Sequence, residues 1–204
     1  MPALPPKTLP FPVPRETLAK LENYESLVQQ WQKAINLVSP TSLNDCWQRH
    51  IVDSAQLLPL IPHLPHDGHL IDLGSGAGFP GLVLAVLLPT NWQITLIESD
   101  QRKAIFLRET ARQLGCQNVL VLAERLEKAK ADLADVVTAR ALAPLPQLWA
   151  WVQPLLKPEG MAIFPKGRDW QTELEATNLG NNWQATPHPS LTDAEAQIIA
   201  IKQA

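Results

Sequence analysis

The most informative part of this 204-residue chain is Leu70-Ile71-Asp72-Leu73-Gly74-Ser75-Gly76-Ala77-Gly78-Phe79-Pro80-Gly81. It opens with an apolar run typical of a buried strand, continues with closely spaced glycines, and ends with a proline suited to a first helical turn. Glycines between a strand and a helix let the backbone approach a ligand without an intervening Cβ atom. The stretch therefore predicts a ligand-binding loop at the carboxyl end of a strand, where open α/β sheets bind their ligands.

Short apolar runs alternate with helical patterns after residue 68, which predicts parallel strands joined by right-handed crossovers in a doubly wound α/β sheet. The expected strands are His69–Leu73, Gln93–Ile97, Val119–Leu122, Asp135–Thr138, Met161–Phe164 and Gln197–Lys202. The expected helices are Gly81–Leu88, Arg102–Leu114, Leu145–Leu156 and Arg168–Thr177. The last two apolar segments, near Trp183 and Ile198, have no helical pattern between them. We expect them to form a hairpin that adds antiparallel pairing at the sheet edge.

The chain before this alternation divides into a tail and a helical subregion. Six prolines in residues 1–14 predict a tail that is extended or poorly ordered. Apolar residues at steps of three and four from Leu18 to Ile35 predict an amphipathic helix. A second helix is expected from Leu43 to Leu58 with Ser42 as its N-cap, followed by a linker over Pro59–Gly68. The expected organisation is a tail at 1–14, a helical subregion at 15–64 and a sheet domain at 65–204.

Composition excludes several classes of protein. A formal charge of −3 argues against a broadly basic nucleic-acid wrapper. The two cysteines, Cys46 and Cys116, form no CxxC pair and are expected to be buried thiols in a reducing compartment. The chain begins without a signal-peptide pattern and has no apolar run long enough to span a bilayer, so we expect a soluble cytoplasmic protein. His63, His66 and His69 straddle prolines with no cysteine nearby, so we expect no metal site.

The glycine spacing identifies the class of ligand. The pattern is G-x-G-x-G, which is usual for S-adenosylmethionine methyltransferases, rather than the G-x-G-x-x-G of nicotinamide-dependent oxidoreductases. Glu98 follows about twenty residues later, where a carboxylate can accept both ribose hydroxyls. Residues 65–99 contain no lysine or arginine, which suits a sulfonium cation better than a pyrophosphate. Asp72 either contacts the ligand or braces the loop through backbone N–H groups.

Several further motifs point to one family. They are Trp31-Gln32-Lys33-Ala34-Ile35-Asn36-Leu37, Arg49-His50-Ile51-Val52-Asp53-Ser54, Gly74–Gly81, Arg102-Lys103-Ala104-Ile105-Phe106-Leu107-Arg108, Thr138-Ala139-Arg140-Ala141 and Lys166-Gly167. From about Tyr24 to Gly167 the chain resembles the bacterial 16S rRNA guanine-N7 methyltransferases, also called methyltransferase G or glucose-inhibited division protein B. Where the family usually has threonine after Asn-Leu, this chain has Val38-Ser39.

The resemblance implies a Rossmann-like class I methyltransferase domain at 65–204 that moves a methyl group from S-adenosyl-L-methionine to N7 of a guanine in 16S rRNA. It implies a cofactor pocket that includes Gly74, Phe79, Glu98-Ser99, Arg125-Leu126 and Arg140. The glycine loop adds Asp72, Ser75, Gly76 and Gly78 to these candidates. Phe79 has an alternative role as a core residue at the start of a helix. The expected partner is 16S rRNA or the small ribosomal subunit, bound by a monomer.

Locally basic stretches supply the candidates for RNA contact. Lys103 lies in the basic segment 100–112, and Lys166 and Arg168 follow a strand expected at the ligand-binding edge. Arg49 shares a helical turn with His50 and Asp53. This turn either flanks the substrate entrance or is a salt-linked contact between the helical subregion and the sheet.

No catalytic residue is predicted. Guanine N7 has an in-plane lone pair and no proton at neutral pH, so its attack on a methyl group needs no general base. A competing hypothesis is a non-catalytic RNA-binding factor that retains an adenosylmethionine pocket.

Overall fold

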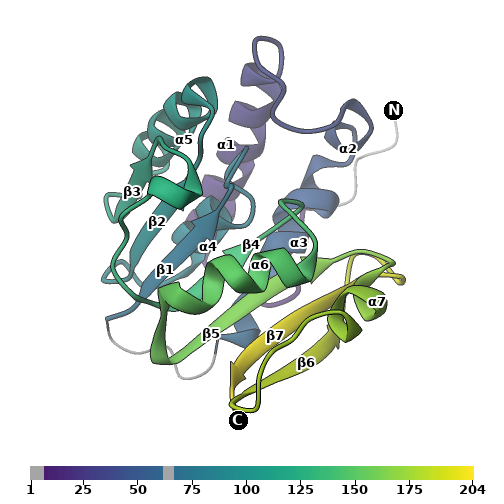
Figure 1. Ribbon diagram of the computed structural model, residues 1–204. Helices are drawn as coiled ribbons and strands as arrows, with labels where there is room; N and C mark the ends of the chain where they lie inside the picture. The colour runs from purple at the N-terminus through teal and green to yellow at the C-terminus, as the bar shows by residue number, and fades with distance from the viewer. Residues whose placement is uncertain (1–6, 62–66) are drawn as a thin grey trace.

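The computed structural model describes residues 7–61 and 67–204. Seven strands form one mixed sheet in the order β3-β2-β1-β4-β5-β7-β6 (Figure 1). Their bounds are β1 His69–Leu73, β2 Gln93–Ile97, β3 Val119–Leu122, β4 Ala134–Ala139, β5 Leu156–Lys166, β6 Trp183–Pro189 and β7 Gln197–Gln203. Strands β1 to β5 are parallel, and β7 runs antiparallel to both β5 and β6. The doubly wound sheet with a C-terminal antiparallel hairpin is therefore confirmed.

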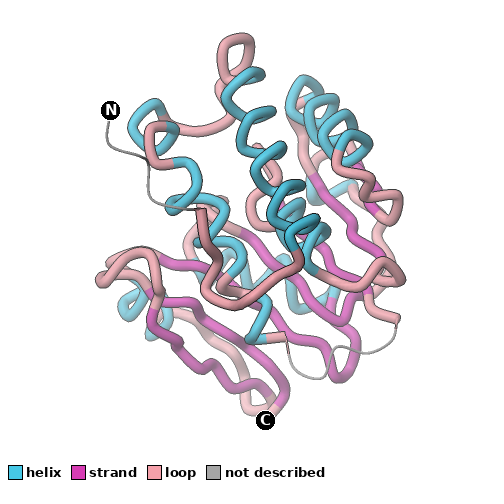
Figure 2. Tube along the Cα trace, turned by 180° about the vertical axis from the view of Figure 1, so that it is seen from behind, coloured by secondary structure: helices cyan, strands magenta, loops and turns pink. Residues whose placement is uncertain are grey.

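Helices cover both faces of this sheet. Successive strand residues point to opposite sides, and the apolar side chains on each side pack against helices. Leu70 belongs to the apolar cluster beneath α1 Arg15–Trp31, α4 Gly81–Leu87 and α5 Gln101–Gln113. Ile71, the next residue, belongs to the cluster beneath α6 Leu145–Val152 and α7 Trp170–Glu175. All five residues of β1 are buried, as a central parallel strand requires. The views from the two sides show these helical layers with the sheet between them (Figures 1 and 2).

The expected single helix from Leu43 to Leu58 is wrong. The segment contains α2 Pro40–Leu43, a π-helical turn η1 Trp47–Val52, α3 Asp53–Ala55 and a 3₁₀ turn η2 Leu58–Leu60. The N-cap is Ser39 rather than Ser42, and its hydroxyl accepts from the backbone N–H of Ser42. The hydroxyl of Ser42 instead contacts His50 Nε2 at 3.0 Å. Tertiary contacts of this kind override the helical periodicity, and π turns occur preferentially at functional sites.

The described part of the proline-rich tail is fixed to the helices. Lys7 forms an ion pair with the buried Glu25 of α1. The carbonyl of Thr8 accepts from Trp47 Nε1 at 3.0 Å, and Leu9 and Phe11 pack against the first apolar cluster. Because α1 shares that cluster with α4 and α5, the helices and the sheet have a common core. The boundary between residues 64 and 65 stays a prediction, and His63 and His66 lie outside the described residues.

Several further element boundaries differ from expectation, and helix α1, for example, ends at Trp31 rather than at Ile35. Helix α6 ends at Val152 and is followed by a 3₁₀ turn η4 Gln153–Leu155 instead of continuing to Leu156. Strand β5 begins five residues earlier than Met161, with an irregularity in its pairing to β4 between Ala134 and Val136. The sequence 158–160, Pro-Glu-Gly, interrupts the apolar pattern there, and bulged strand positions tolerate such residues.

Candidate functional site

The glycine loop turns sharply between β1 and α4. Two of its glycines adopt backbone conformations that other residues rarely adopt. Gly78 has φ +88°, and a Cβ atom there would lie 2.6 Å from both Leu82 Cδ1 and Tyr24 Oη. Gly76 has φ +56°, but the nearest atom to a Cβ there would be the Gly74 carbonyl at 3.8 Å. Glycine is the residue that adopts such φ values without strain. Gly78 therefore permits packing against α1, whereas Gly76 leaves space at the surface of the loop.

Asp72 lies beneath the loop rather than at its surface. Its side chain is fully buried, and Oδ2 accepts from the Gly81 backbone N–H at 3.2 Å. Oδ1 has no hydrogen-bond partner among the described residues. Burial raises the pKa of this carboxyl to about 7. This geometry favours the bracing role over direct ligand contact.

Glu98 fastens the loop to the next crossover. At the end of β2, its Oε2 accepts from the Gly76 N–H at 2.8 Å and its Oε1 accepts from the Asp100 N–H at 2.7 Å. Asp100 is in turn the N-cap of α5. The Glu98 carboxylate thus connects the glycine loop to the start of α5. It lies at the carboxyl-end edge of the sheet, where the ribose of the cofactor is expected.

A cavity of about 580 Å³ opens at the carboxyl ends of the parallel strands. Its walls come from the N-terminal helical segment, the glycine loop, the ends of β4 and β5, and the loop between β6 and β7. The site residues predicted from sequence that line it are Gly74, Ser75, Gly76, Phe79, Arg140, Arg49, Lys103 and Lys166. The predicted residues absent from its lining are Asp72, Gly78, Glu98, Ser99, Arg125, Leu126 and Arg168.

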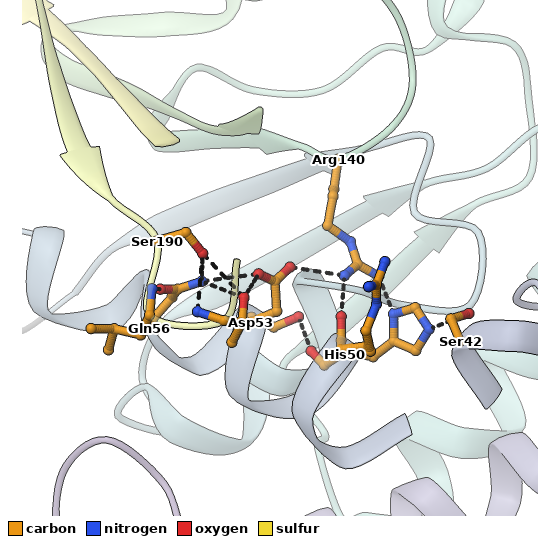
Figure 3. A network of polar contacts seen from close by, with 10 residues as sticks. Ser42, His50, Asp53, Gln56, Arg140 and Ser190 are labelled. Atoms are coloured by element: carbon orange, nitrogen blue, oxygen red, sulfur yellow. Dashed lines mark hydrogen bonds and ion pairs between the residues drawn. The ribbon is translucent and has the colours of Figure 1, made fainter. Parts of the chain in front are cut away.

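Arg140 joins the end of β4 to the N-terminal helical segment. Its Nη1 donates to Asp53 Oδ2 at 3.0 Å and to the Arg49 carbonyl at 3.1 Å, and its Nη2 donates to His50 Nδ1 at 2.9 Å (Figure 3). Because Nδ1 accepts, the proton of the neutral imidazole lies on Nε2, which donates to Ser42. Burial, with Arg140 and Arg49 nearby, lowers the pKa of His50 to about 3. The Arg49-His50-Asp53 turn therefore forms the salt-linked contact with the sheet, and it also lines the cavity. Its place at a substrate entrance stays a prediction.

Phe79 lies within a stack of rings. Its ring centroid is 5.0 Å from that of Tyr24 and 4.8 Å from that of His50, and the Arg140 guanidinium carbon lies 5.3 Å from it. Phe79 is 4% exposed, so most of the side chain serves as the core residue at the helix start. The stack places Arg140 above the glycine loop and holds its position.

The four cations proposed for RNA contact have different surroundings. Lys166 is ion-paired with Glu173 at 2.6 Å, and its side chain is only 10% exposed. Arg168 is exposed and pairs with Glu195 at 2.9 Å. Arg49 and Lys103 line the cavity without a carboxylate partner in the described chain. RNA contact by these residues stays a prediction, and the geometry favours Arg49 and Lys103.

One wall of the cavity is not predicted by any motif in the sequence. Ser190, Thr192 and Asp193 line it from the β6–β7 loop, and buried Gln56 donates to Ser190 Oγ at 3.2 Å. The Ser-Leu-Thr-Asp run predicts a turn. Nothing local indicates that a turn more than one hundred residues from the glycine loop faces the same cavity.

Comparisons with known proteins identify the family. The family model described as rRNA small subunit methyltransferase G matches residues 17–198. The ribosomal RNA small subunit methyltransferase G of Cereibacter sphaeroides is 48% identical over 193 residues, which cover 93% of this chain and 91% of that protein. The protein of that name from Gluconobacter oxydans is 47% identical over 190 residues, with coverage of 93% and 95%. The chain belongs to the rRNA small subunit methyltransferase G family.

Solved structures confirm the fold of this protein. An O-methyltransferase from Bacillus cereus in complex with SAH gives a TM-score of 0.63 at 13% identity, covering 95% of this chain and 93% of that one. TomG from Streptomyces achromogenes, in complex with SAM, gives 0.61 at 14% identity, with coverage of 91% and 90%. The family and fold are those of an S-adenosylmethionine-dependent rRNA methyltransferase, so the oxidoreductase hypothesis is wrong.

The site fits this cofactor. The loop surface at Gly76 is open, the glycine loop lies at the end of β1, and a buried carboxylate, Glu98, ends the neighbouring strand. Across residues 7–61 and 67–204, no group of three or more metal-ligating side chains could hold a metal ion. Within those same residues no helix combines the length and apolarity needed to cross a membrane.

Proposed function

We propose that this protein transfers a methyl group to N7 of a guanine in 16S rRNA, acting as a monomer in the cytoplasm on the RNA or the small subunit. The observation that carries the proposal is one cavity that joins the open glycine loop to two cations that form no ion pair within the described residues. Gly76 supplies the open loop surface, and Arg49 and Lys103 supply the cations. A cofactor and a polyanion can therefore meet in one place.

The cofactor residues fall into three groups by their position. Gly74, Ser75, Gly76, Phe79 and Arg140 line the cavity and would hold the end of the cofactor that bears the methyl group. Glu98, Ser99, Arg125 and Leu126 follow the second and third strands and would hold the adenosine. Asp72 and Gly78 hold the loop itself. When bound, S-adenosylmethionine supplies an electrophilic methyl group.

Positioning is the main contribution of the protein to this reaction. The acceptor nitrogen has its own lone pair, and aligning two reacting atoms can supply about 7–11 kcal/mol. His50 is the histidine of the cavity lining, and both of its ring nitrogens are engaged, with Arg140 and with Ser42. Its role is to hold Arg140 rather than to move a proton.

We expect the single-turnover rate at saturating cofactor to stay nearly constant from pH 6 to pH 9. The pKa of His50 is lowered to about 3, so this residue stays neutral over that range. Asp72 titrates near pH 7 but does not line the cavity, so its charge is expected to change stability instead. A rapid-quench series across pH measures the rate. A steep rise near neutrality, removed by mutating one His, Asp or Glu, would contradict this mechanism and indicate an acceptor that bears a proton.

Salt dependence distinguishes the cations that contact phosphate. For Lys103→Ala we expect weaker RNA binding and a slope of log K against log salt reduced by about one, because one phosphate contact is lost. Lys166→Ala is the comparison: its cation is already neutralised by Glu173, so the slope should change by clearly less. Filter binding of 16S rRNA between low and moderate salt measures both slopes. Equal changes in the two variants would show that Lys166 leaves Glu173 to bind RNA.

A deletion strain tests the function directly. Small subunits from cells that lack this gene are incubated with the purified protein and labelled S-adenosylmethionine. Mass spectrometry of the digested RNA is expected to show one new 7-methylguanosine. A methyl group on another atom would overturn the N7 assignment. Tight RNA binding without transfer would favour the non-catalytic factor.

A further inference from the structure

The loop between β6 and β7 is held by hydrogen bonds from the N-terminal helical segment. The backbone N–H of Leu191 donates to Gln56 Oε1 at 2.7 Å, and Thr192 Oγ1 donates to Asp53 Oδ1 at 2.6 Å. Ser190 Oγ accepts from Gln56 Nε2 at 3.2 Å (Figure 3). Gln56 is 5% exposed, and both of its polar side-chain atoms are used in this contact. Three consecutive loop residues are thus anchored from one helical turn.

The side chain at the centre of this anchored loop faces solvent. Leu191 is 64% exposed, the largest fraction among the exposed large apolar side chains of the described residues. Its neighbours Ser190 and Thr192 line the cavity. Binding to a flexible loop costs conformational entropy, because the loop must become ordered. The backbone of this loop is already held in place, so most of that cost does not arise on binding. A partner with an apolar face would therefore bind there at little further cost.

The charges of the cavity indicate which partner this is. Arg140 and Lys166 are neutralised by Asp53 and Glu173. Arg49 and Lys103 keep their charge without a carboxylate partner in the described chain. An occupant that combines phosphates with flat apolar faces matches both features, and an unstacked stretch of RNA has this chemistry.

We propose that loop 190–193 contacts the RNA beside the acceptor base, with Leu191 packing against an unstacked base and Asp53 and Gln56 acting as positioning residues. The inference rests on the proposed function. Guanine N7 lies on the major-groove edge, which is deep and narrow in an RNA helix, so the base must be unstacked to react. Apolar side chains commonly occupy or cover the space where stacking is lost.

The same network links the loop to the reaction centre. The Asp53 carboxylate accepts from Thr192 through Oδ1 and from Arg140 through Oδ2. A displacement of the loop is therefore passed to Arg140, which lies against Phe79 of the glycine loop. The Asp53 carboxylate therefore connects the loop that would contact RNA to Arg140, which would contact the cofactor.

The first test uses Leu191→Ala with small subunits from the deletion strain as substrate. We expect the KM for subunits to rise about tenfold, with the Kd for S-adenosylmethionine and the Tm unchanged. Leu133→Ala is the matched control, because Leu133 is 47% exposed and precedes β4 at the opposite end of the sheet. An unchanged KM for Leu191→Ala, with active wild-type protein, would overturn the inference.

The second test addresses positioning. Thr192→Val keeps the shape of the side chain but removes the hydrogen bond to Asp53, whereas Thr192→Ser keeps the hydroxyl. We expect the KM for subunits to rise about tenfold in the valine variant and to return to near the wild-type value in the serine variant. Equal behaviour of the two variants would show that the hydroxyl does not position the loop.

A photoreactive aromatic amino acid at position 191 separates RNA from protein as the partner. Crosslinking to 16S rRNA near the methylated base supports the proposal, whereas crosslinking only to a ribosomal protein overturns it. Wild-type protein that transfers no methyl group would contradict the proposed function. Normal wild-type transfer together with an unaffected Leu191→Ala variant would contradict the loop assignment alone.

Discussion

Gly76→Ala is expected to fold normally and to lose cofactor affinity by about 100-fold, because the added methyl group would fill the surface on which the cofactor rests. The Cβ atom would meet no protein atom closer than the Gly74 carbonyl at 3.8 Å, so the fold has room for it. The backbone at φ +56° adds a strain of about 1 kcal/mol in any residue other than glycine. Isothermal calorimetry with S-adenosylmethionine measures the affinity, and thermal unfolding measures the stability.

Gly115→Ala is the matched control for this strain. Gly115 follows α5, has φ +71°, and has nothing within 4 Å of a Cβ position, but it does not line the cavity. Both variants should therefore lose similar stability, while only Gly76→Ala loses cofactor. Normal affinity in Gly76→Ala would remove this face of the loop from the cofactor site.

Asp72→Asn is expected to stabilise the protein at pH 8 by about 1–3 kcal/mol and to remove a pH dependence of stability. In the folded chain burial raises the pKa of Asp72 from 3.8 to about 7, so the folded state holds a proton that the unfolded state has lost. The contribution of Asp72 to the free energy of unfolding should therefore be full below pH 4, fall as pH rises toward 7, and stay level above it. The full fall is about 4 kcal/mol. The gain in stability of Asp72→Asn at pH 8 is smaller than this fall, because the amide NH₂ of asparagine would be buried where Oδ1 has no hydrogen-bond partner among the described residues.

Urea unfolding of wild-type and variant protein at several pH values measures this effect. Asp135→Asn is the control, because it removes a carboxylate from the opposite end of the sheet, where Asp135 pairs with Lys157. It is expected to leave the pH slope between 4 and 7 in place. A stability difference between Asp72→Asn and wild-type protein that does not grow between pH 4 and pH 7 would contradict a raised pKa at Asp72.

Local patterns in the sequence were sufficient for the sheet and the cofactor loop. Strands β1, β2 and β3 have the bounds that their apolar runs predict, and the run from Leu70 to Gly81 forms the expected strand, turn and helix start. These features depend on side chains close together in the chain and on the rule that parallel strands end at one edge. Glu98 lies near the loop for the same reason, since it ends the strand next to β1.

Long-range contacts determined the rest of the site. Arg140 contacts Asp53 across 87 residues, and Asp53 contacts Thr192 across 139 residues. The motifs that contain Asp53 and Arg140 are visible in the sequence, but no local pattern predicts that these two side chains contact each other or that Asp53 contacts Thr192. The π turn η1 and the antiparallel hairpin bring the three segments together, and burial then makes their hydrogen bonds specific. The sequence alone thus determined the sheet and the class of cofactor, whereas the acceptor side of the cavity depends on the packing of distant segments.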